Sequence, residues 1–578
     1  MKPKRVLLIG GTGVFGRRLA RHIGARNDIE LILTSRSSQR AEALARDLNT
    51  RLKTEGKSTD APAISGISLD RRDADAAFLG SLSPWLVIYA SGPFQSWDHA
   101  LAGAAIAAGA HVIDLADART YLLTYPEALD TSARAKGVVA LAGVSTTPTL
   151  SEAVVTELAA DFRRVDTIDM AIAPAGRSEV GPAVLDAILG MAGQPVPIRD
   201  EGRLSSGIGW SDQQTITIPT LGRRSVARVE TIDAERLGLL GRSALRVAFF
   251  AGLESSLERF GLHVLAALRR RGWLPDPKPL VPLLFFLRRI LRVTASDRGG
   301  MVVRLTGIGR DGSRAEAEWS LVAEENDGLS VPILPAAAAV GALLARRLEP
   351  GARLGPDALH LADIEAETSP YAIETRIRRR KLEGSVFLAA LGEAAEAALP
   401  KALRRFHAAD GAPVWQGRAD IDAGTGWLSS LAAAVFGLPA AGRDVPVTVS
   451  VDRRIGPDVG TKIDPVPPSF HTEIWSRRFG DRRFSSTLHS TRPGIVTEAA
   501  GPFAFDLGVQ CDADGLSLPV VGWRLFGVRM PVVLAPVSVS REHVDDQDRF
   551  RFDIRVSLPT GGLLIAYRGW LMPLADAG

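Results

Sequence analysis

The chain has 578 residues, 46% of them hydrophobic and 23% charged, and its formal net charge is only +4. At one domain per roughly 100–200 residues, this length predicts three or four domains. The near balance of charge, without zinc-finger or RNA-binding motifs, argues against nucleic acid as a partner. The single cysteine, Cys511, leaves no internal disulfide, and no export signal follows the basic start of the chain, so we expect a cytoplasmic protein.

Residues 1–150 predict a Rossmann-type, doubly wound α/β domain. Short apolar runs alternate with helical patterns, which is typical of buried parallel strands joined by crossover helices. Right-handed crossovers then give a parallel sheet with helices on both faces. The expected strands are Arg5–Ile9, Glu30–Thr34, Trp85–Tyr89, His111–Asp114 and Val138–Leu141.

A glycine-rich loop follows the first strand. Its residues fit the pattern G-x-G-x-x-G and are Gly11, Thr12, Gly13, Val14, Phe15 and Gly16. The loop opens an amphipathic helix, which is the context that makes this pattern informative. Gly11 permits the tight turn, Gly13 lets the backbone approach a pyrophosphate, and Gly16 lets the helix lie close to the strand. We therefore interpret the loop as a dinucleotide site, with the anion at the helix N-terminus, rather than as a ligand-free turn.

The end of the second strand predicts NADP(H) rather than NAD(H). An NAD-selective fold usually has an acidic residue there to bind the ribose 2′-hydroxyl, whereas this chain has Ser35, Arg36 and Ser37. Arg36 lies 20 residues after Gly16, where a guanidinium can bind a 2′-phosphate and the two serines can donate to it. The alternative is that Arg36 is a solvated loop residue.

Glycines at the later strand ends predict where the nicotinamide lies, because ligands of such sheets bind beyond the carboxyl ends of the strands. Ser91, Gly92 and Pro93 follow the fourth strand, and Gly143 follows the sixth. We expect the first three beside the cofactor, and we expect Gly92 and Gly143 to let the backbone approach the nicotinamide ring.

Candidates for the reaction itself are few. Asp114 and Asp117 follow the fifth strand, and either can act as a general acid or base if its pKa is raised. The commoner role of loop aspartates is to cap helices or to bind loop amides. None of the five tyrosines precedes a lysine by four residues, and the nine histidines show no metal-binding spacing, so we expect no metal.

Residues 151–377 predict an α+β middle domain that binds the substrate and closes over the nicotinamide. Helical stretches surround four expected strands. The uncharged run 328–345 is mostly alanine and contains two prolines, so we expect a packed helix there rather than a membrane span. The expected strands are Ile168–Ala173, Thr215–Ile218, Met301–Leu305 and Ala317–Val322.

Within this domain, residues 249–293 combine aromatic and basic side chains. Two pairs of phenylalanines, at 249–250 and 285–286, occur with arginine runs at 269–271 and 288–289. Such a mixture is found in helices that lie in a membrane interface. Two readings follow: the segment covers the active-site entrance or makes peripheral contact with a membrane, or it is an ordinary core segment.

Residues 386–573 predict a β-rich C-terminal domain. Apolar and polar residues alternate strictly from Phe550 to Leu558, a turn at 559–562 follows, and 563–571 returns as a second strand. Half the side chains of each strand must face an interior, so we expect an independently folding curved sheet around an apolar cup.

Five stretches of the N-terminal region together form a recognisable pattern. This pattern resembles the saccharopine dehydrogenase-like (saccharopine reductase-like) NADP-binding family. The resemblance implies an NADP-binding Rossmann domain with a second α+β domain inserted before its last helix, so the end of 151–377 should return to the Rossmann domain. Members include reductases and proteins of no known activity, so the resemblance implies no particular substrate. The stretches are Gly10–Gly16, Thr34–Arg36, Ser91–Pro93, Ala108–Leu115 and Ala142–Pro148.

The C-terminal region looks like a bacterial domain of unknown function that often follows this nucleotide domain. The resemblance brings no chemistry with it. It rests on Trp475–Gly480, Glu498, Gly501–Pro502, Gly527–Pro531 and Tyr567–Trp570.

These features favour an NADP-dependent oxidoreductase whose substrate is a small molecule, apolar or lipid-like. The alternative is a non-catalytic NADP(H)-binding carrier or sensor of a hydrophobic ligand. A titratable side chain in a cavity at the nicotinamide would favour the enzyme, because hydride chemistry comes from the cofactor and positioning and proton transfer come from the protein.

Overall fold

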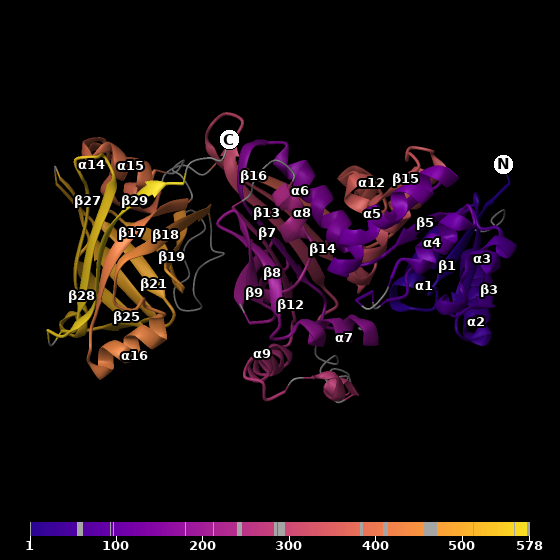
Figure 1. The fold of residues 1–578 in the computed structure, drawn as a ribbon, viewed down its shortest axis with the longest axis horizontal. Coiled ribbons are helices and arrows are strands. Elements are labelled where there is room, and N and C mark those ends of the chain that lie inside the picture. The colour runs from indigo at the N-terminus through magenta and orange to yellow at the C-terminus, as the bar shows by residue number, and fades with distance from the viewer. Residues whose placement is uncertain are drawn as a thin grey trace. The chain divides into compact units, whose positions relative to one another are not determined.

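The computed structural model describes residues 2–54, 62–92, 94–95, 98–179, 181–211, 213–239, 245–274, 276–282, 286, 295–381, 385–408, 414–455, 471–512, 514–559 and 561–574. By its contacts the chain divides into two compact units (Figure 1). The first unit comprises Met1–Asp161, Ile168–Leu305 and Ala317–Arg378, and the second comprises Phe162–Thr167, Thr306–Glu316 and Arg379–Gly578.

The N-terminal part of the first unit is built on a seven-stranded parallel sheet, which confirms the expected Rossmann domain. Its order is β3-β2-β1-β4-β5-β6-β15, so the strand order reverses between β1 and β4, the switch point at which such folds bind ligands. The edge strand β15 follows most of the middle domain in the sequence and returns to this sheet. The bounds are β1 Lys4–Ile9, β2 Ile29–Ser35, β3 Ser65–Ser68, β4 Leu86–Tyr89, β5 His111–Asp114, β6 Val139–Ala142 and β15 Gly351–Leu354.

Helices cover both faces of this sheet, and this is why its central strands are nearly continuous apolar runs. The helices α3, α4 and α5 share one core with the strands, and α1, α2 and α11 pack on the other side. In the described part of the chain one stretch, Asp327–Leu344, is long and apolar enough to span a membrane, and 67% of it is buried in the fold. The bounds are α1 Val14–Ile23, α2 Ser38–Thr54, α3 Ala76–Leu82, α4 Ala100–Ala107, α5 Arg119–Lys136 and α11 Leu334–Leu344.

The middle domain contains a nine-stranded sheet with helices beside it. Its main path is β10-β11-β12-β7-β13-β14-β16, and the β8–β9 hairpin joins it at β12. The strands are β7 Phe162–Ala173, β8 Pro195–Asp200, β9 Arg203–Ile208, β10 Gln214–Ile218, β11 Gly222–Arg228, β12 Arg246–Gly252, β13 Gly299–Gly309, β14 Arg314–Ala323 and β16 Ile373–Lys381. The helices are α6 Ser151–Ala159, α7 Pro182–Met191, α8 Asp233–Leu239, α9 Ser256–Arg270 and α12 Leu361–Ala366.

The aromatic pair Phe249–Phe250 agrees with the second reading of residues 249–293, an ordinary core segment. Both side chains are buried in strand β12, and Phe250 belongs to the core of the middle sheet. They therefore cannot contribute to an exposed interfacial surface, and any such surface must come from later residues of the segment. Phe285 and the arginines at 288–289 lie outside the described residues.

The second unit contains a single antiparallel sheet of thirteen strands. Its order is β23-β24-β27-β28-β29-β17-β18-β19-β20-β21-β22-β25-β26. The predicted alternating strand and its return are β28 and β29. The bounds are β17 Val414–Ala423, β18 Gly442–Ile455, β19 His471–Phe479, β20 Arg482–Arg492, β21 Ile495–Ala500, β22 Phe503–Gly508, β23 Gln510–Asp512, β24 Gly515–Ser517, β25 Val520–Leu525, β26 Val528–Met530, β27 Val537–Val544, β28 Phe550–Ser557 and β29 Leu563–Pro573.

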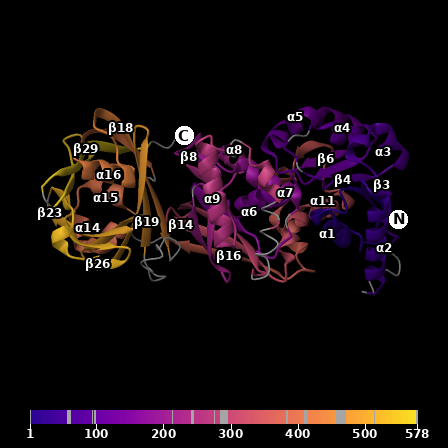
Figure 2. The ribbon, with the colours of Figure 1, turned by 90° about the horizontal axis from the view of Figure 1, so that it is seen from below.

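This sheet curves around short helices that precede and interrupt it (Figure 2). Phe406 of α15 stacks on Phe550 of β28, with ring centroids 4.0 Å apart, and lies edge-on to Trp415 of β17. The expected apolar concavity is therefore present, and the chain's own helices α13 and α15 fill it. The helices are α13 Val386–Leu391, α14 Glu393–Ala398, α15 Lys401–His407 and α16 Trp427–Phe436.

Candidate dinucleotide site and substrate cleft

A cleft of 2140 Å³ lies within the first unit, where the carboxyl ends of the parallel strands meet the middle domain. Binding sites for drug-sized ligands usually enclose about 300–1,000 Å³. The cleft therefore has room for a dinucleotide together with a second molecule.

The glycine loop forms one wall of this cleft. Gly10, Thr12, Gly13, Val14 and Phe15 line it. Gly13 is the N-cap of α1 and provides no side-chain cap, and the first turn of the helix has no acidic residue. The first N–H groups and the positive end of the helix dipole therefore remain available to an anion.

Gly11 and Gly16 do not line the cleft but shape the loop. A Cβ on Gly16 would lie 2.1 Å from the carbonyl oxygen of Gly10, and a Cβ on Gly11 would lie 3.2 Å from Leu33. The structure thus gives Gly16 the packing role expected for it, since only glycine lets α1 lie this close to β1. Gly10, at φ 80°, supplies the left-handed turn that the sequence reading gave to Gly11.

A basic region lies beyond the end of β2. Ser35, Arg36, Ser37 and Arg40 line the cleft there, and the Arg36 side chain is exposed. The structure adds Arg71 and Arg72, which follow β3, a strand that we did not locate from sequence. We therefore find four arginines at this end of the cleft, where the predicted 2′-phosphate would bind.

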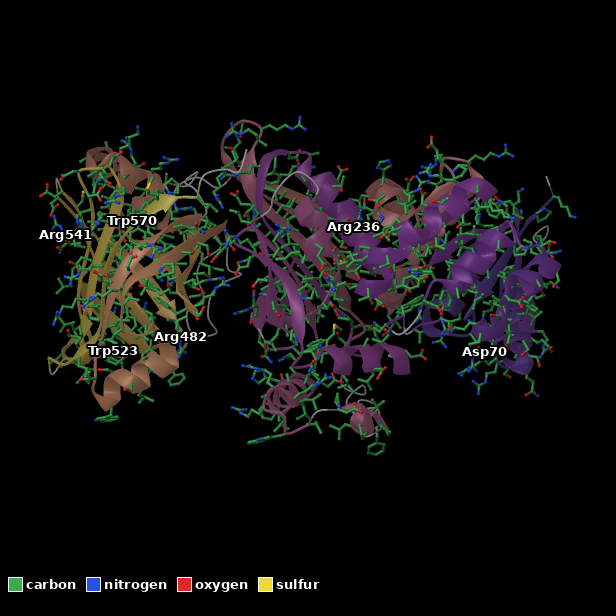
Figure 3. All side chains as sticks on the ribbon, viewed as in Figure 1. Asp70, Arg236, Arg482, Trp523, Arg541 and Trp570 are labelled. Carbon is green, nitrogen blue, oxygen red and sulfur yellow. The ribbon has the colours of Figure 1, made fainter. Side chains whose placement is uncertain are left out.

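One acid accompanies these arginines. Asp70 accepts from Arg72 at 2.9 Å, and this ion pair holds the pKa of the Asp70 carboxyl well below its usual range. Figure 3 labels Asp70 at the outer part of the Rossmann domain. Because Arg72 neutralises Asp70, the guanidinium of Arg36 faces little competition for an incoming phosphate.

Of the two glycines expected beside the nicotinamide, Gly92, after β4, lines the cleft and Gly143, after β6, does not. Ser91 and Gly92 line the cleft, whereas Pro93 lies outside the described residues. The expectation for Gly143 is wrong. Its N–H donates to Asp114 at 2.9 Å, and a Cβ there would meet Pro148 at 2.8 Å, so this glycine permits close packing away from the cleft.

The two candidate aspartates have different roles. Asp114 is 1% exposed and accepts from the N–H groups of Gly143 and Ala116 and from the Tyr121 hydroxyl, at 2.9, 3.1 and 3.0 Å. Burial raises the pKa of Asp114 to about 6, but no ligand in the cleft can reach its carboxyl. It fixes the loops after β5 and β6, which is the structural role that the sequence left open.

Asp117 faces the cleft. Its side chain is accessible from the cavity, while protein surrounds it on the other sides, and this desolvation raises the pKa of the carboxyl. The amide of Gln95 lies 3.4 Å away. Asp117 is thus the one of the two aspartates that a bound substrate can touch.

A second carboxyl, Glu230, lines the same cleft from the middle domain. Burial raises the pKa of Glu230, and the charges of Glu235 and Asp117 raise it further, against the opposing effect of Arg119. Arg119 is itself held by Glu235, with Nε 2.6 Å from Oε1. Asp117 and Glu230, called the carboxyl pair below, thus line the same cleft, and each has a raised pKa that lets it retain a proton at higher pH than an isolated acid.

The part of the cleft beyond these acids is apolar. All six lining arginines belong to the Rossmann side, at positions 17 to 119, and the described lining residues of the middle domain include acids but no lysine or arginine. Such a surface favours an uncharged or cationic ligand over a carboxylate or phosphate. Its apolar members are Ile172, Val184, Ile188, Met191, Val196, Trp210, Val229, Phe249 and Leu253.

Besides Arg119 with Glu235, further ion pairs join the Rossmann and middle domains. Arg17 of α1 pairs with Glu179, and both residues line the cavity. Farther from it, Arg236 of α8, labelled in Figure 3, binds the buried Glu152 at 2.8 Å and Asp357 at 2.7 Å. Within the described residues no group of three or more His, Cys, Asp or Glu side chains could hold a metal ion.

Comparison with known families agrees with this geometry. Residues 6–141 match the family described as the saccharopine dehydrogenase NADP binding domain. The N-terminal domain is similar to this family. Residues 399–571 match a domain of unknown function, DUF4166, which brings no chemistry to the second unit. A comparison with curated proteins finds no match.

Several solved structures match this chain at low sequence identity. They include saccharopine dehydrogenase (L-Glu forming) from Saccharomyces cerevisiae, at 14% identity, TM-score 0.46, and coverage of 65% of this chain and all of that one. Amine dehydrogenase from Mycobacterium smegmatis matches at 13% identity and TM-score 0.32, covering 62% of this chain and 96% of that chain. GenD2 from gentamicin A biosynthesis, in complex with NAD, matches at 13% identity and TM-score 0.30, covering 66% and 97%.

The saccharopine dehydrogenase NADP-binding domain supports a nicotinamide dinucleotide as the cofactor and an NAD(P)-dependent oxidoreductase as the class of protein. The cleft residues fit such a cofactor, since a glycine cradle with free helix N–H groups faces the cavity. The domain match leaves the substrate open.

Proposed function

We propose that this protein is an NADP(H)-dependent oxidoreductase that acts on an apolar substrate without acidic groups. The proposal rests on one observation: a single continuous cleft is lined by both the cofactor-binding residues and the residues that would contact a substrate. The glycine loop, Arg36 and Asp117 lie on its Rossmann side, and a largely apolar surface that also carries Glu230 and other acids lies on its middle-domain side. A dinucleotide laid from Arg36 across the glycine loop would direct its nicotinamide toward the carboxyl pair.

The preference for NADP(H) rests on the residues at the end of β2. The end of β2 carries no carboxylate for a ribose 2′-hydroxyl, the nearby Asp70 is paired with Arg72, and Ser35 and Ser37 flank Arg36 in the sequence. A guanidinium and hydroxyl donors are the groups that bind a phosphate monoester well.

The proposed chemistry divides between cofactor and chain. When bound, the nicotinamide supplies or accepts the hydride. Burial raises the pKa of both Asp117 and Glu230, so either carboxyl, when protonated, can donate a proton to a substrate oxygen or nitrogen as that atom gains charge. In the reverse direction the same pair accepts the proton, while the apolar wall positions the substrate and excludes water.

The charged residues that line the middle-domain side of the cleft indicate the class of substrate. Saccharopine-like substrates carry several carboxylates, and binding them would need cations on the middle-domain side of the cleft. The described residues there supply Glu230, Glu254 and Glu258 instead. We therefore expect a neutral, lipid-like molecule that carries a carbonyl, hydroxyl, imine or amine.

Transfer of isotope from labelled cofactor tests this function without knowledge of the substrate. Full-length protein is incubated with NADPH deuterated at C4 and an apolar metabolite extract, and products are analysed by mass spectrometry. We expect an apolar product that gains one deuterium. Asp117→Asn and Glu230→Gln should abolish the labelling while NADPH binding stays within about twofold of the wild type, because neither side chain is needed to hold the dinucleotide. Glu127→Gln, an exposed acid on α5 outside the cleft, is the control that should label normally.

The non-catalytic carrier predicts the opposite result. Tight NADPH binding with no labelled product, from NADPH deuterated on either face, would favour the carrier. Equal labelling by the wild type and the Asp117→Asn, Glu230→Gln double variant would remove the carboxyl pair from the mechanism and leave the cofactor assignment intact.

A further inference from the structure

Helix α9 presents an apolar stripe to solvent on its outer side. Leu257, Phe260 and Val264 are 61%, 66% and 37% exposed, and their spacing of three and four residues places them on one face. The opposite face is buried through Leu262 and Leu265. Figure 2 shows α9 on the near side of the first unit. An outward stripe of large apolar side chains is unusual on a helix whose other face already packs in the core.

Two further large aromatic side chains that follow the helix in the sequence are exposed to solvent. Trp273 is 74% exposed and Phe286 is 62% exposed. The guanidinium of Arg271 lies 6.0 Å from the centre of the Trp273 ring, and Arg270 beside it is also exposed. Tryptophan with arginine at the edge of an apolar helix face is the combination that settles at the boundary between lipid headgroups and acyl chains.

The surface adjoins the substrate side of the cleft. Arg269 donates to the carbonyl oxygens of Leu189 and Ala192 at 3.0 and 3.1 Å and so ties the end of α9 to the end of α7. Residues of α7 line the cleft, as does Glu258 in the first turn of α9. The helix that carries the exposed stripe is thus part of the cavity wall.

We propose that the outer face of α9, with Arg270, Arg271 and Trp273, docks on an anionic lipid surface. The apolar side chains enter the headgroup boundary, and the two arginines meet the negative charge of the lipids. The arginines attract an anionic bilayer. A second copy of the chain in a symmetric contact would instead bring arginines of the two copies together, and their like charges would repel. The docking goes beyond the proposed function and does not depend on it, but it would place the apolar cleft beside a source of lipid-like substrate.

Flotation of the full-length protein with vesicles tests the docking. One set of vesicles is pure phosphatidylcholine, and the other contains equal amounts of phosphatidylcholine and phosphatidylserine. We expect flotation with the anionic vesicles at low salt and its loss at high salt, since salt screens exposed charges. Arg270→Gln and Arg271→Gln should each lower the partition coefficient about fivefold on anionic vesicles.

Matched variants separate the apolar contribution from the charges. Leu257→Ser and Phe260→Ser should each weaken binding about tenfold on anionic vesicles. Leu123→Ser removes a side chain of similar exposure, 44%, from α5 and should change nothing. Because all of these residues are exposed, the variants should keep the wild-type melting temperature and NADPH affinity.

Three results would overturn the proposal. The first is no flotation of folded protein at low salt. The second is equal binding to both kinds of vesicle. The third is self-association that Phe260→Ser abolishes, without vesicle binding, which would make the stripe a contact between copies of the chain. Since NADPH binding is measured on the same samples, none of these results can be confused with failure of the proposed function.

Discussion

Replacing the glycines of the cofactor loop should separate folding from dinucleotide binding. A Cβ on Gly13 would meet one atom, the carbonyl oxygen of Gly10 at 3.2 Å, and the backbone there, at φ −73°, is open to any residue. Gly13→Ala should therefore change the free energy of unfolding by less than about 1 kcal/mol. Its methyl group would stand on the cavity side of the loop, where a pyrophosphate must approach. The loss of one charge-assisted hydrogen bond, about 1.5–3 kcal/mol, should weaken NADPH binding about 10- to 150-fold.

Gly16→Ala should behave differently. Its Cβ would lie 2.1 Å from the Gly10 oxygen and 2.9 Å from the Gly11 Cα, both of them backbone atoms that cannot turn aside. We expect it to destabilise the domain by about 1–3 kcal/mol and also to weaken NADPH, because α1 must move away from β1. Gly80→Ala, in α3 with nothing within 4 Å, is the control and should be neutral or slightly stabilising.

The measurements are thermal unfolding and calorimetric titration with NADPH for all three variants. If Gly13→Ala binds NADPH as tightly as the wild type, the pyrophosphate does not lie on this loop. If Gly16→Ala is as stable as Gly80→Ala, the close packing of α1 on β1 is wrong.

Three further predictions concern stability. Burial raises the pKa of Asp114 to about 6 in the folded chain, so the contribution of this group to stability should be present in full below about pH 4 and should fall by about 3 kcal/mol as pH rises to about 6. Asp114→Asn should remove this part of the pH dependence of the unfolding free energy in urea titrations across that range, and an unchanged pH dependence would assign it to another group. Glu318→Ala breaks a buried pair with Arg304, 2.6 Å long, and should cost about 3–5 kcal/mol, whereas Glu42→Ala on the exposed face of α2 should cost less than about 0.5 kcal/mol. Residues 386–578 expressed alone should fold with a cooperative melt, because the core around α13 and α15 is drawn entirely from that range; a disordered circular dichroism spectrum would show that this core is insufficient.

The Rossmann sheet could be predicted because its strands are buried on both faces and read as continuous apolar runs. The run Leu86–Tyr89 is an example, since all four of its residues are buried. Strand β3 could not be located, because Ser65–Ser68 contains one large apolar residue and is half exposed at the sheet edge. Because β3 was not located, Arg71 and Arg72 were not predicted as site residues, since their position at the same end of the cleft as Arg36 depends on that strand.

Site residues could be predicted from sequence only where they belong to one continuous stretch of the chain. The glycine loop and Arg36 are local patterns, and the structure places both on the cleft. Glu230 gave no signal, because it lies 113 residues after Asp117 and only the fold brings the two acids to one cavity. The two readings of Phe249 and Phe250 could not be separated from sequence, since an aromatic pair beside a later run of arginines has the same local pattern in a buried strand as at an interface; the structure agrees with the core reading for this pair.

Titration of the wild-type protein with NADPH and NADH at one fixed salt concentration tests the central claim most directly. The account predicts that NADPH binds about 10- to 150-fold more tightly, through a charge-assisted hydrogen bond from Arg36 to the 2′-phosphate. Arg36→Ala should then weaken NADPH to the level of NADH and leave NADH unchanged. Equal affinity for both cofactors in the wild type, or equal weakening of both by Arg36→Ala, would contradict it.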